Sequence, residues 1–199
     1  MSDRMVVSAI PVVVGDGVAL RFDGVAMTLH WLTAVLVVTL FALAQVWGLF
    51  PRGDATRHAL QSLHISLGLL LTLVVVGRVL WRTIFARPMP PAGSGPLEIA
   101  ARGMHFLLYG LLLLMIVAGF GKQWVPGHPL SFFGLVSLPP PVAFDPVWRG
   151  VVNVAHEWGA WTIIVLAGLH AAAALFHHYV LRDDVLRRML PGRRIPAGH

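Results

Sequence analysis

The 199-residue sequence contains no cysteine, and only 12% of its residues are charged. The absence of cysteine excludes disulfides, iron–sulfur clusters held by thiolates and covalent attachment of a haem through a C-x-x-C-H motif. A soluble domain has about a quarter of its residues charged, whereas 57% of this chain is hydrophobic. The composition therefore predicts an integral membrane protein with room for about four membrane spans.

Four apolar segments are long enough to cross a bilayer, and they cover about residues 28–48, 63–84, 101–121 and 155–179. They predict an all-α membrane protein whose four-transmembrane-helix bundle occupies residues 27–181. Residues 1–26 are interpreted as a non-cleaved cytoplasmic lead-in, because no small-residue cleavage site follows their short apolar run. The proline-rich segment 122–153 is too broken to cross and predicts a cap lying on the outer membrane surface. Residues 182–199 form a basic tail.

Cationic residues are distributed unevenly among the loops. The lead-in, the second loop and the tail hold ten arginines, namely Arg4, Arg21, Arg82, Arg87, Arg102, Arg182, Arg187, Arg188, Arg193 and Arg194. The first and third loops hold four cations, namely Arg52, Arg57, Lys122 and Arg149. The positive-inside rule then predicts that both termini lie in the cytoplasm. The net charge of +6 is explained by these loops, with no nucleic-acid partner.

Four histidines, in the first, second and fourth apolar segments, can be compared by their depth in the membrane. His156 and His170 are 14 residues apart, which is about 21 Å along a helix and about 40° around it. The predicted orientation places His156 and His64 near the outer edge of the bilayer, and His170 and His30 near the cytoplasmic edge. Two imidazoles that face each other between helices can clamp an iron porphyrin from both sides. Iron saturated in this way suits electron transfer, so we predict two haems.

Several neighbouring residues have predicted roles at these haems. Gly68, Gly159 and Gly168 lie within one turn of the histidines and would give a macrocycle clearance from the backbone. Arg78 is predicted to pair with a haem propionate at the inner pair, or alternatively to extend to the cytoplasmic interface. His105, at the start of the third span, would either touch a quinone or relay protons near the inner haem, or act as an interfacial anchor.

The sequence does not favour two competing interpretations of the histidines, namely additional iron ligands and a transport pathway. His177 and His178 lie beyond the hydrocarbon core and are interpreted as interfacial residues. Histidines along one helix face also suit a proton or metal transporter. However, the only acidic residue inside a predicted span is Glu157, at an edge, and no methionine or cysteine ligand series accompanies it.

Several motifs resemble those of the bacterial cytochrome b561 family. They are LHW at the start of the first span, the FPR turn, LHISLG, MHFLLYG, AHEWG and GLHAAAALFHHY, and the resemblance covers roughly residues 27–192. It is strongest to the small stand-alone members that include superoxide oxidase. The resemblance implies a four-helix bundle in the bacterial inner membrane, two bis-histidine b haems and quinone as redox partner. The ligand pairs it implies are His30 with His170 and His64 with His156.

The resulting functional prediction is a superoxide:ubiquinone oxidoreductase that takes electrons at the periplasmic side and reduces quinone. Its partners would be membrane lipid, quinone and a small outer electron donor such as superoxide. The alternative is a haem-b anchor subunit that passes electrons from a partner dehydrogenase or hydrogenase to quinone. A self-contained cap and short loops favour the first interpretation, whereas co-purification of a second subunit would favour the alternative.

Overall fold

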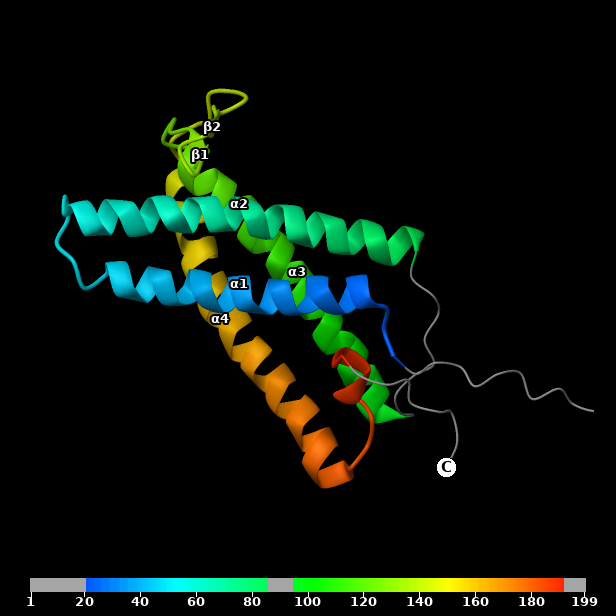
Figure 1. Ribbon diagram of the computed structural model, residues 1–199. Helices are drawn as coiled ribbons and strands as arrows, with labels where there is room; N and C mark the ends of the chain where they lie inside the picture. The colour runs from blue at the N-terminus through cyan, green and yellow to red at the C-terminus, as the bar shows by residue number, and fades with distance from the viewer. Residues whose placement is uncertain (1–20, 86–94, 192–199) are drawn as a thin grey trace, which may run out of the picture.

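The computed structural model describes residues 21–85 and 95–191 (Figure 1). The four long helices are α1 (Gly24–Trp47), α2 (Ala55–Ile84), α3 (Pro96–Trp124) and α4 (Trp148–Phe176). A π-helix, η1 (His177–Leu181), continues α4, and a 3-10 helix, η2 (Arg187–Met189), follows it. Each long helix is long and apolar enough to span a membrane, which confirms the predicted four-helix membrane protein. Most of the predicted lead-in and the end of the tail lie outside the described residues.

Aspartate caps set the starts of the first two helices. The Asp23 carboxylate accepts a hydrogen bond from the backbone N–H of Ala26 at 2.9 Å. The Asp54 carboxylate accepts hydrogen bonds from the N–H groups of Thr56 at 2.8 Å and Arg57 at 3.2 Å. These bonds satisfy N–H groups that have no partner within the helix. Both helices therefore begin before the apolar stretches that the sequence analysis identified.

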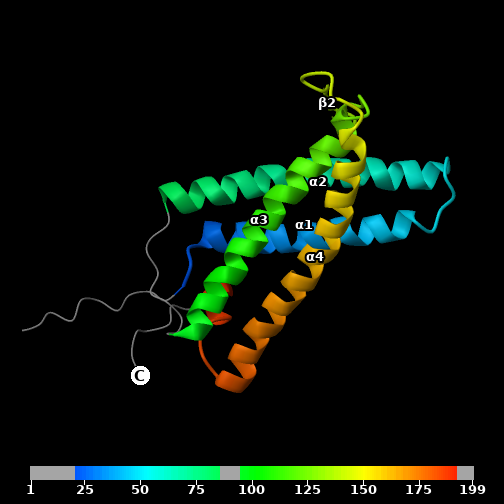
Figure 2. The ribbon, with the colours of Figure 1, turned by 180° about the vertical axis from the view of Figure 1, so that it is seen from behind.

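The helices are arranged as two antiparallel hairpins that cross each other. Figures 1 and 2 show α1 beside α2 and α3 beside α4, and most interhelical contacts lie within these hairpins rather than between them. Glycines bring α3 and α4 close together, because a Cβ at Gly121 would lie 2.8 Å from Val152 Cγ1. A Cβ at Gly159 would lie 2.8 Å from Met115 Sδ. Packing between the two hairpins is sparse, and the predicted haem-binding histidines lie in this region.

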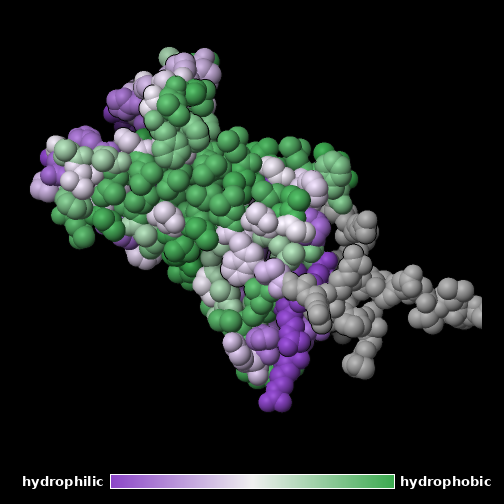
Figure 3. Space-filling view, viewed as in Figure 1, coloured by the Kyte–Doolittle hydropathy of each residue, from purple (hydrophilic) through white to green (hydrophobic). Residues whose placement is uncertain are grey.

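An apolar core occupies the middle of the molecule. Its buried members are Leu36, Leu40, Leu71, Val74, Val75, Leu112 and Ile163. Outside this core, many large apolar side chains of the helices are exposed. Figure 3 shows apolar residues spread over the middle of the visible face, with hydrophilic residues gathered toward its ends. This distribution fits helices whose central parts contact lipid.

A two-stranded antiparallel ribbon forms part of the predicted cap. Strand β1 (Leu130–Phe132) pairs with β2 (Val136–Leu138). Phe133, Gly134 and Leu135 connect them. Phe133 and Gly134 have φ angles of 50° and 73°, in the left-handed region that suits a tight turn. The sequence analysis predicted no strands in this segment, because three-residue strands are shorter than a periodic pattern can reveal.

Ser66 of α2 attaches this ribbon to the helices. It is 2% exposed. Its hydroxyl donates a hydrogen bond to the Ser62 carbonyl at 3.0 Å, and the Ser131 carbonyl lies 3.3 Å away. The same oxygen accepts a hydrogen bond from the N–H of Phe133 at 2.9 Å. One side chain therefore fixes the turn of the ribbon against α2, two residues after His64.

The segment after η1 folds back toward the start of α1. The indole N–H of Trp31 donates a hydrogen bond to the Met189 carbonyl at 2.8 Å. The guanidinium of Arg21 donates another to the Leu190 carbonyl at 3.0 Å. The last described residues of the predicted tail thus lie against the end of α1 that carries His30.

Candidate functional site

Two histidine pairs bridge the two hairpins. The ring centroids of His30, on α1, and His170, on α4, are 6.4 Å apart, with ring planes at 78°. Those of His64, on α2, and His156, on α4, are 6.2 Å apart, with planes at 71°. The structure therefore brings together the same side chains that their depths had paired. Ligation of iron by either pair stays a prediction.

The spacing within each pair fits two ligands on one metal ion. A first-row metal binds an imidazole nitrogen at about 2.0–2.1 Å, and that nitrogen lies about 1.1 Å from the ring centre. Two imidazoles on opposite sides of one ion then have centres about 6.2–6.4 Å apart, which matches the observed 6.2 and 6.4 Å. Nearly perpendicular ring planes are compatible with this arrangement, because each ring can rotate about the common axis.

Hydrogen bonding of the ring nitrogens also fits ligand roles. His64 Nδ1 lies 3.1 Å from the Leu40 carbonyl, which leaves Nε2 available as a ligand, as is usual for metal-binding histidines. The Nδ1 atom of His30 is buried and has no hydrogen-bond partner among the described residues, whereas the His156 ring interacts with the Met115 backbone. A buried ring nitrogen without a partner is costly, and a metal bond through the other nitrogen of the ring would offset part of that cost.

The glycines near the histidines divide into two kinds. A Cβ at Gly68 or Gly168 would meet nothing within 4 Å, so these positions leave room for a bound group. Gly159 instead allows α4 to pack closely on Met115 of α3. Its lack of a side chain therefore serves the contact between the two helices and not a bound group. Gly119 lies next to the outer pair, because a Cβ there would be 3.5 Å from His156 Cε1.

Arg78 lies in the inner half of α2 and contacts α3. Its guanidinium carbon is 5.1 Å from the ring centroid of Tyr109, within the range of a cation–π interaction. Its charge lies within electrostatic range of His30 and His170. No carboxylate among residues 21–85 and 95–191 forms an ion pair with it. The cation is thus available to an anionic group at the inner pair, and its role toward a propionate stays a prediction.

His105 lies immediately beside the inner pair. Its ring centroid is 5.3 Å from that of His170, with ring planes at 69°. Depth alone had left His105 without a partner, and the structure shows that it flanks an existing pair. Tyr109, one turn along the same face of α3, was not identified from the sequence. Its spacing of four residues from His105 was the available signal.

The loop cations Lys122 and Arg57 differ in their surroundings. Lys122 lies within electrostatic range of His64, His156 and Glu157. Arg57, by contrast, donates hydrogen bonds to the carbonyls of Trp47 at 3.3 Å and Phe50 at 2.8 Å. Arg57 therefore holds the α1–α2 turn and does not point freely toward an outer ligand.

Other cap residues lie around a separate cavity. Arg149 lines a cavity of about 470 Å³ with Trp124, Pro126 and Phe144. The cavity places it beside apolar cap residues at the start of α4.

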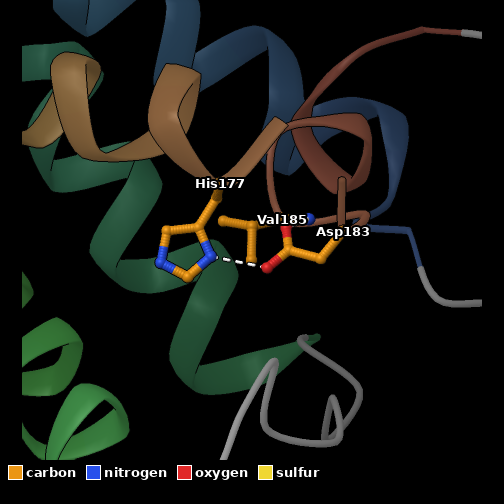
Figure 4. Close-up of polar contacts among 3 residues, drawn as sticks. All are labelled: His177, Asp183 and Val185. Carbon is orange, nitrogen blue, oxygen red and sulfur yellow. Dashed lines mark hydrogen bonds and ion pairs between the residues drawn. The ribbon is translucent and has the colours of Figure 1, made fainter. Parts of the chain in front are cut away.

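His177 has a partner of its own. Its Nδ1 lies 2.5 Å from Asp183 Oδ2 (Figure 4), and the other oxygen of Asp183 accepts a hydrogen bond from the N–H of Val185 at 3.0 Å. This carboxylate fixes the turn that follows η1. Within the described part of the chain, no group of three or more His, Cys, Asp or Glu residues is arranged to hold a metal ion.

Apolar side chains separate the two histidine pairs. On α4, the buried Ile163 lies midway between His156 and His170 in the sequence. On α1, Leu36 and Leu40 follow His30 and belong to the same buried core. This layer divides the space between the hairpins into an inner and an outer site.

Comparisons with known proteins agree with one another. A family model described as prokaryotic cytochrome b561 matches residues 21–192. Cytochrome b561 homolog 2 of Escherichia coli K12 is 36% identical over 171 residues, covering 85% of this chain and 91% of that protein. Cytochrome b561 homolog 1 of the same organism is 30% identical over 176 residues, covering 87% and 99%. A probable superoxide oxidase, CybB of Yersinia pestis, is 26% identical over 175 residues, covering 87% and 98%.

Proposed function

We infer the function of this chain from one premise, which is that it belongs to the prokaryotic cytochrome b561 family. Proteins of this family bind haem b and transfer electrons, and the chain is a multi-pass protein of the bacterial inner membrane. Our finer proposal is that it holds two haems and acts as a superoxide:ubiquinone oxidoreductase. The single observation that carries the two-haem proposal is the pair of histidine contacts, each at ligand spacing and each bridging the hairpins.

Under this proposal, His30 and His170 hold the inner haem, and His64 and His156 hold the outer one. A bound haem would supply a reversible one-electron carrier, and the two imidazoles of a pair would be its ligands. The Leu40 carbonyl orients the outer ligand His64 through Nδ1.

The surrounding residues would control charge and water. Arg78 offers its positive charge to a propionate at the inner pair, since no carboxylate of the described residues neutralises it. Lys122 offers a positive charge near the outer pair, where an anionic donor would arrive. The buried leucine and valine side chains between the pairs exclude water from the path between the two sites.

Superoxide as donor is supported by two observations of different weight. One relative, at 26% identity, is named a probable superoxide oxidase. Lys122 also provides local positive charge for a small anion at the predicted outer side. The overall reaction takes one electron from each of two superoxide ions and adds both electrons and two protons to ubiquinone. Its products are two molecules of oxygen and one ubiquinol.

The first experiment is a reduced-minus-oxidised visible spectrum of the purified protein, with haem counted per chain. We expect two low-spin b haems, and at most one in His64→Ala and in His170→Ala. His58→Ala is the matched control, because His58 is exposed in the first turn of α2 and should leave both haems in place. A stably folded protein without haem would refute the proposal.

The second experiment separates the proposed donor from the alternative. Protein in vesicles containing ubiquinone is exposed to a steady source of superoxide, and ubiquinol formation is followed. Ubiquinol formation that superoxide dismutase abolishes would support the superoxide reaction. Two haems without superoxide-dependent ubiquinol, together with co-purification of a dehydrogenase or hydrogenase, would replace it with the anchor-subunit function.

A further inference from the structure

We propose that Tyr109 forms the binding site for the quinone headgroup, with Arg78 and His105 on either side of it. The proposal rests on the proposed function, because a protein that reduces quinone needs a headgroup site beside one of its two redox centres. It assigns that site to the space between α2 and α3 at the inner pair. The hydroxyl of Tyr109 would donate a hydrogen bond to one quinone carbonyl.

The position of the site follows from helix geometry. His105 and Tyr109 are four residues apart on α3 and so lie on one face, one turn from each other. The His105 ring is 5.3 Å from the His170 ring by centroids. A ligand bound to this face of α3 would therefore be as close to the inner redox centre as a neighbouring side chain is.

The Tyr109 hydroxyl has the property expected of a ligand-binding group. Its oxygen is buried and interacts with the Arg78 guanidinium. Because a guanidinium can only donate hydrogen bonds, the O–H proton of Tyr109 has no acceptor among the described residues. Buried tyrosine hydroxyls usually find a partner, because removing a hydroxyl from water without replacing its hydrogen bond is unfavourable. A carbonyl oxygen supplied by a bound molecule would satisfy it.

Arg78 completes the chemical character of the site. Its guanidinium lies over the Tyr109 ring at 5.1 Å from the centroid. A positive charge there favours electron density arriving on a nearby oxygen. A quinone matches this combination, because it presents a neutral carbonyl acceptor whose oxygen becomes more negative as the ring is reduced.

The surroundings allow a lipid-soluble molecule to enter. Contacts between α2 and α3 are sparse compared with those inside each hairpin. Cβ atoms at Gly77 on α2 and Gly110 on α3, each next to one of the site residues, would meet nothing within 4 Å. The buried Leu112 lies close along α3 and provides apolar surface for a ring.

The test compares the two tyrosines of the chain. Tyr109→Phe removes the hydroxyl and keeps the ring beneath Arg78. Tyr179→Phe is the matched control, because Tyr179 lies in η1 and is 71% exposed. In the haem-loaded protein we measure the KM for the short-chain quinone ubiquinone-1, and the rate of haem reduction by superoxide without quinone. A third measurement is the rise in thermal unfolding temperature that ubiquinone-1 produces.

In Tyr109→Phe we expect the KM for ubiquinone-1 to rise about tenfold, because the substitution removes roughly one hydrogen bond to the quinone. The quinone-induced rise in unfolding temperature should shrink, while the haem content and the rate of haem reduction stay at wild-type values. Tyr179→Phe should match the wild type in every measurement. Tyr109→Gln restores a donor at this position and should recover part of the affinity.

Two results would overturn the site. One is a wild-type KM and thermal shift in Tyr109→Phe, and the other is loss of the inner haem in that variant, which would make Tyr109 part of the haem pocket. Failure of the proposed function is distinguishable from both, because the wild-type protein would then neither bind nor reduce ubiquinone-1.

Discussion

Replacing Ser66 with alanine should release the cap ribbon without changing the helices. The hydroxyl of Ser66 is the acceptor for the N–H of Phe133 at 2.9 Å, and the side chain is 2% exposed. Its removal leaves that N–H without its protein partner in a partly buried setting, which costs about 1–2 kcal/mol. A local loss of this size makes opening of the ribbon about 5–30 times more frequent.

Hydrogen exchange followed by mass spectrometry measures this opening directly. Peptides covering the β1–β2 turn should exchange about 5–30 times faster in Ser66→Ala than in the wild type. Peptides from the middle of α2 should be unchanged. Ser131→Ala is the matched control, because Ser131 receives the contact from Ser66 through its backbone carbonyl, which the substitution retains.

Equal exchange of the turn in Ser66→Ala and the wild type would refute the role of Ser66. An equal acceleration in Ser131→Ala would also refute it, because the effect would then not depend on the Ser66 hydroxyl. The absence of cysteine offers an independent check. A single cysteine at Leu135, which is 81% exposed, can carry a spin label that reports the motion of the ribbon.

Three further substitutions test other parts of the structure. Gly121→Ala should destabilise the protein by about 1–3 kcal/mol in thermal unfolding, because the new methyl group would overlap the stiff side chain of Val152. Gly110→Ala, which meets nothing within 4 Å, should not destabilise it, and equal losses in both would contradict the close α3–α4 packing. Arg78→Gln should lower the midpoint potential of the inner haem in a redox titration, because a nearby positive charge favours the reduced form. An unchanged titration would place Arg78 away from that centre. Asp183→Asn should weaken the bond to the His177 imidazole and speed proteolysis after η1, and a wild-type cleavage rate would show that this contact does not hold the turn.

The sequence was sufficient to predict which histidines face each other, because helix rise and membrane thickness fix the depth of each side chain. His156 and His170 required only their spacing, and His30 and His64 required only the direction of their helices. Helix starts were also predictable in principle, since Asp23 and Asp54 are ordinary capping residues. Hydrophobicity alone does not reveal these helix starts, because both helices begin before their apolar stretches.

Contacts between hairpins could not be predicted in the same way. The stacking of Arg78 on Tyr109 depends on how α2 and α3 are rotated about their own axes, which depth does not determine. The position of Ser66 against the ribbon depends on a turn formed 65 residues later in the chain. The bonds of Trp31 and Arg21 to the C-terminal segment go to backbone carbonyls. Those acceptors are present at every residue and carry no sequence signal.

The apolar layer between the two histidine pairs has an electrical consequence. A dry region with Leu36, Leu40 and Ile163 at its centre lets electrons tunnel but gives protons no hydrogen-bonded route. Under the proposed function, each electron that crosses inward moves net charge through the membrane dielectric, against a potential that is negative inside. A full crossing costs about 2.3 kcal/mol per 100 mV. Under the proposed function, an energised membrane would slow inward transfer, and a collapsed potential would accelerate it.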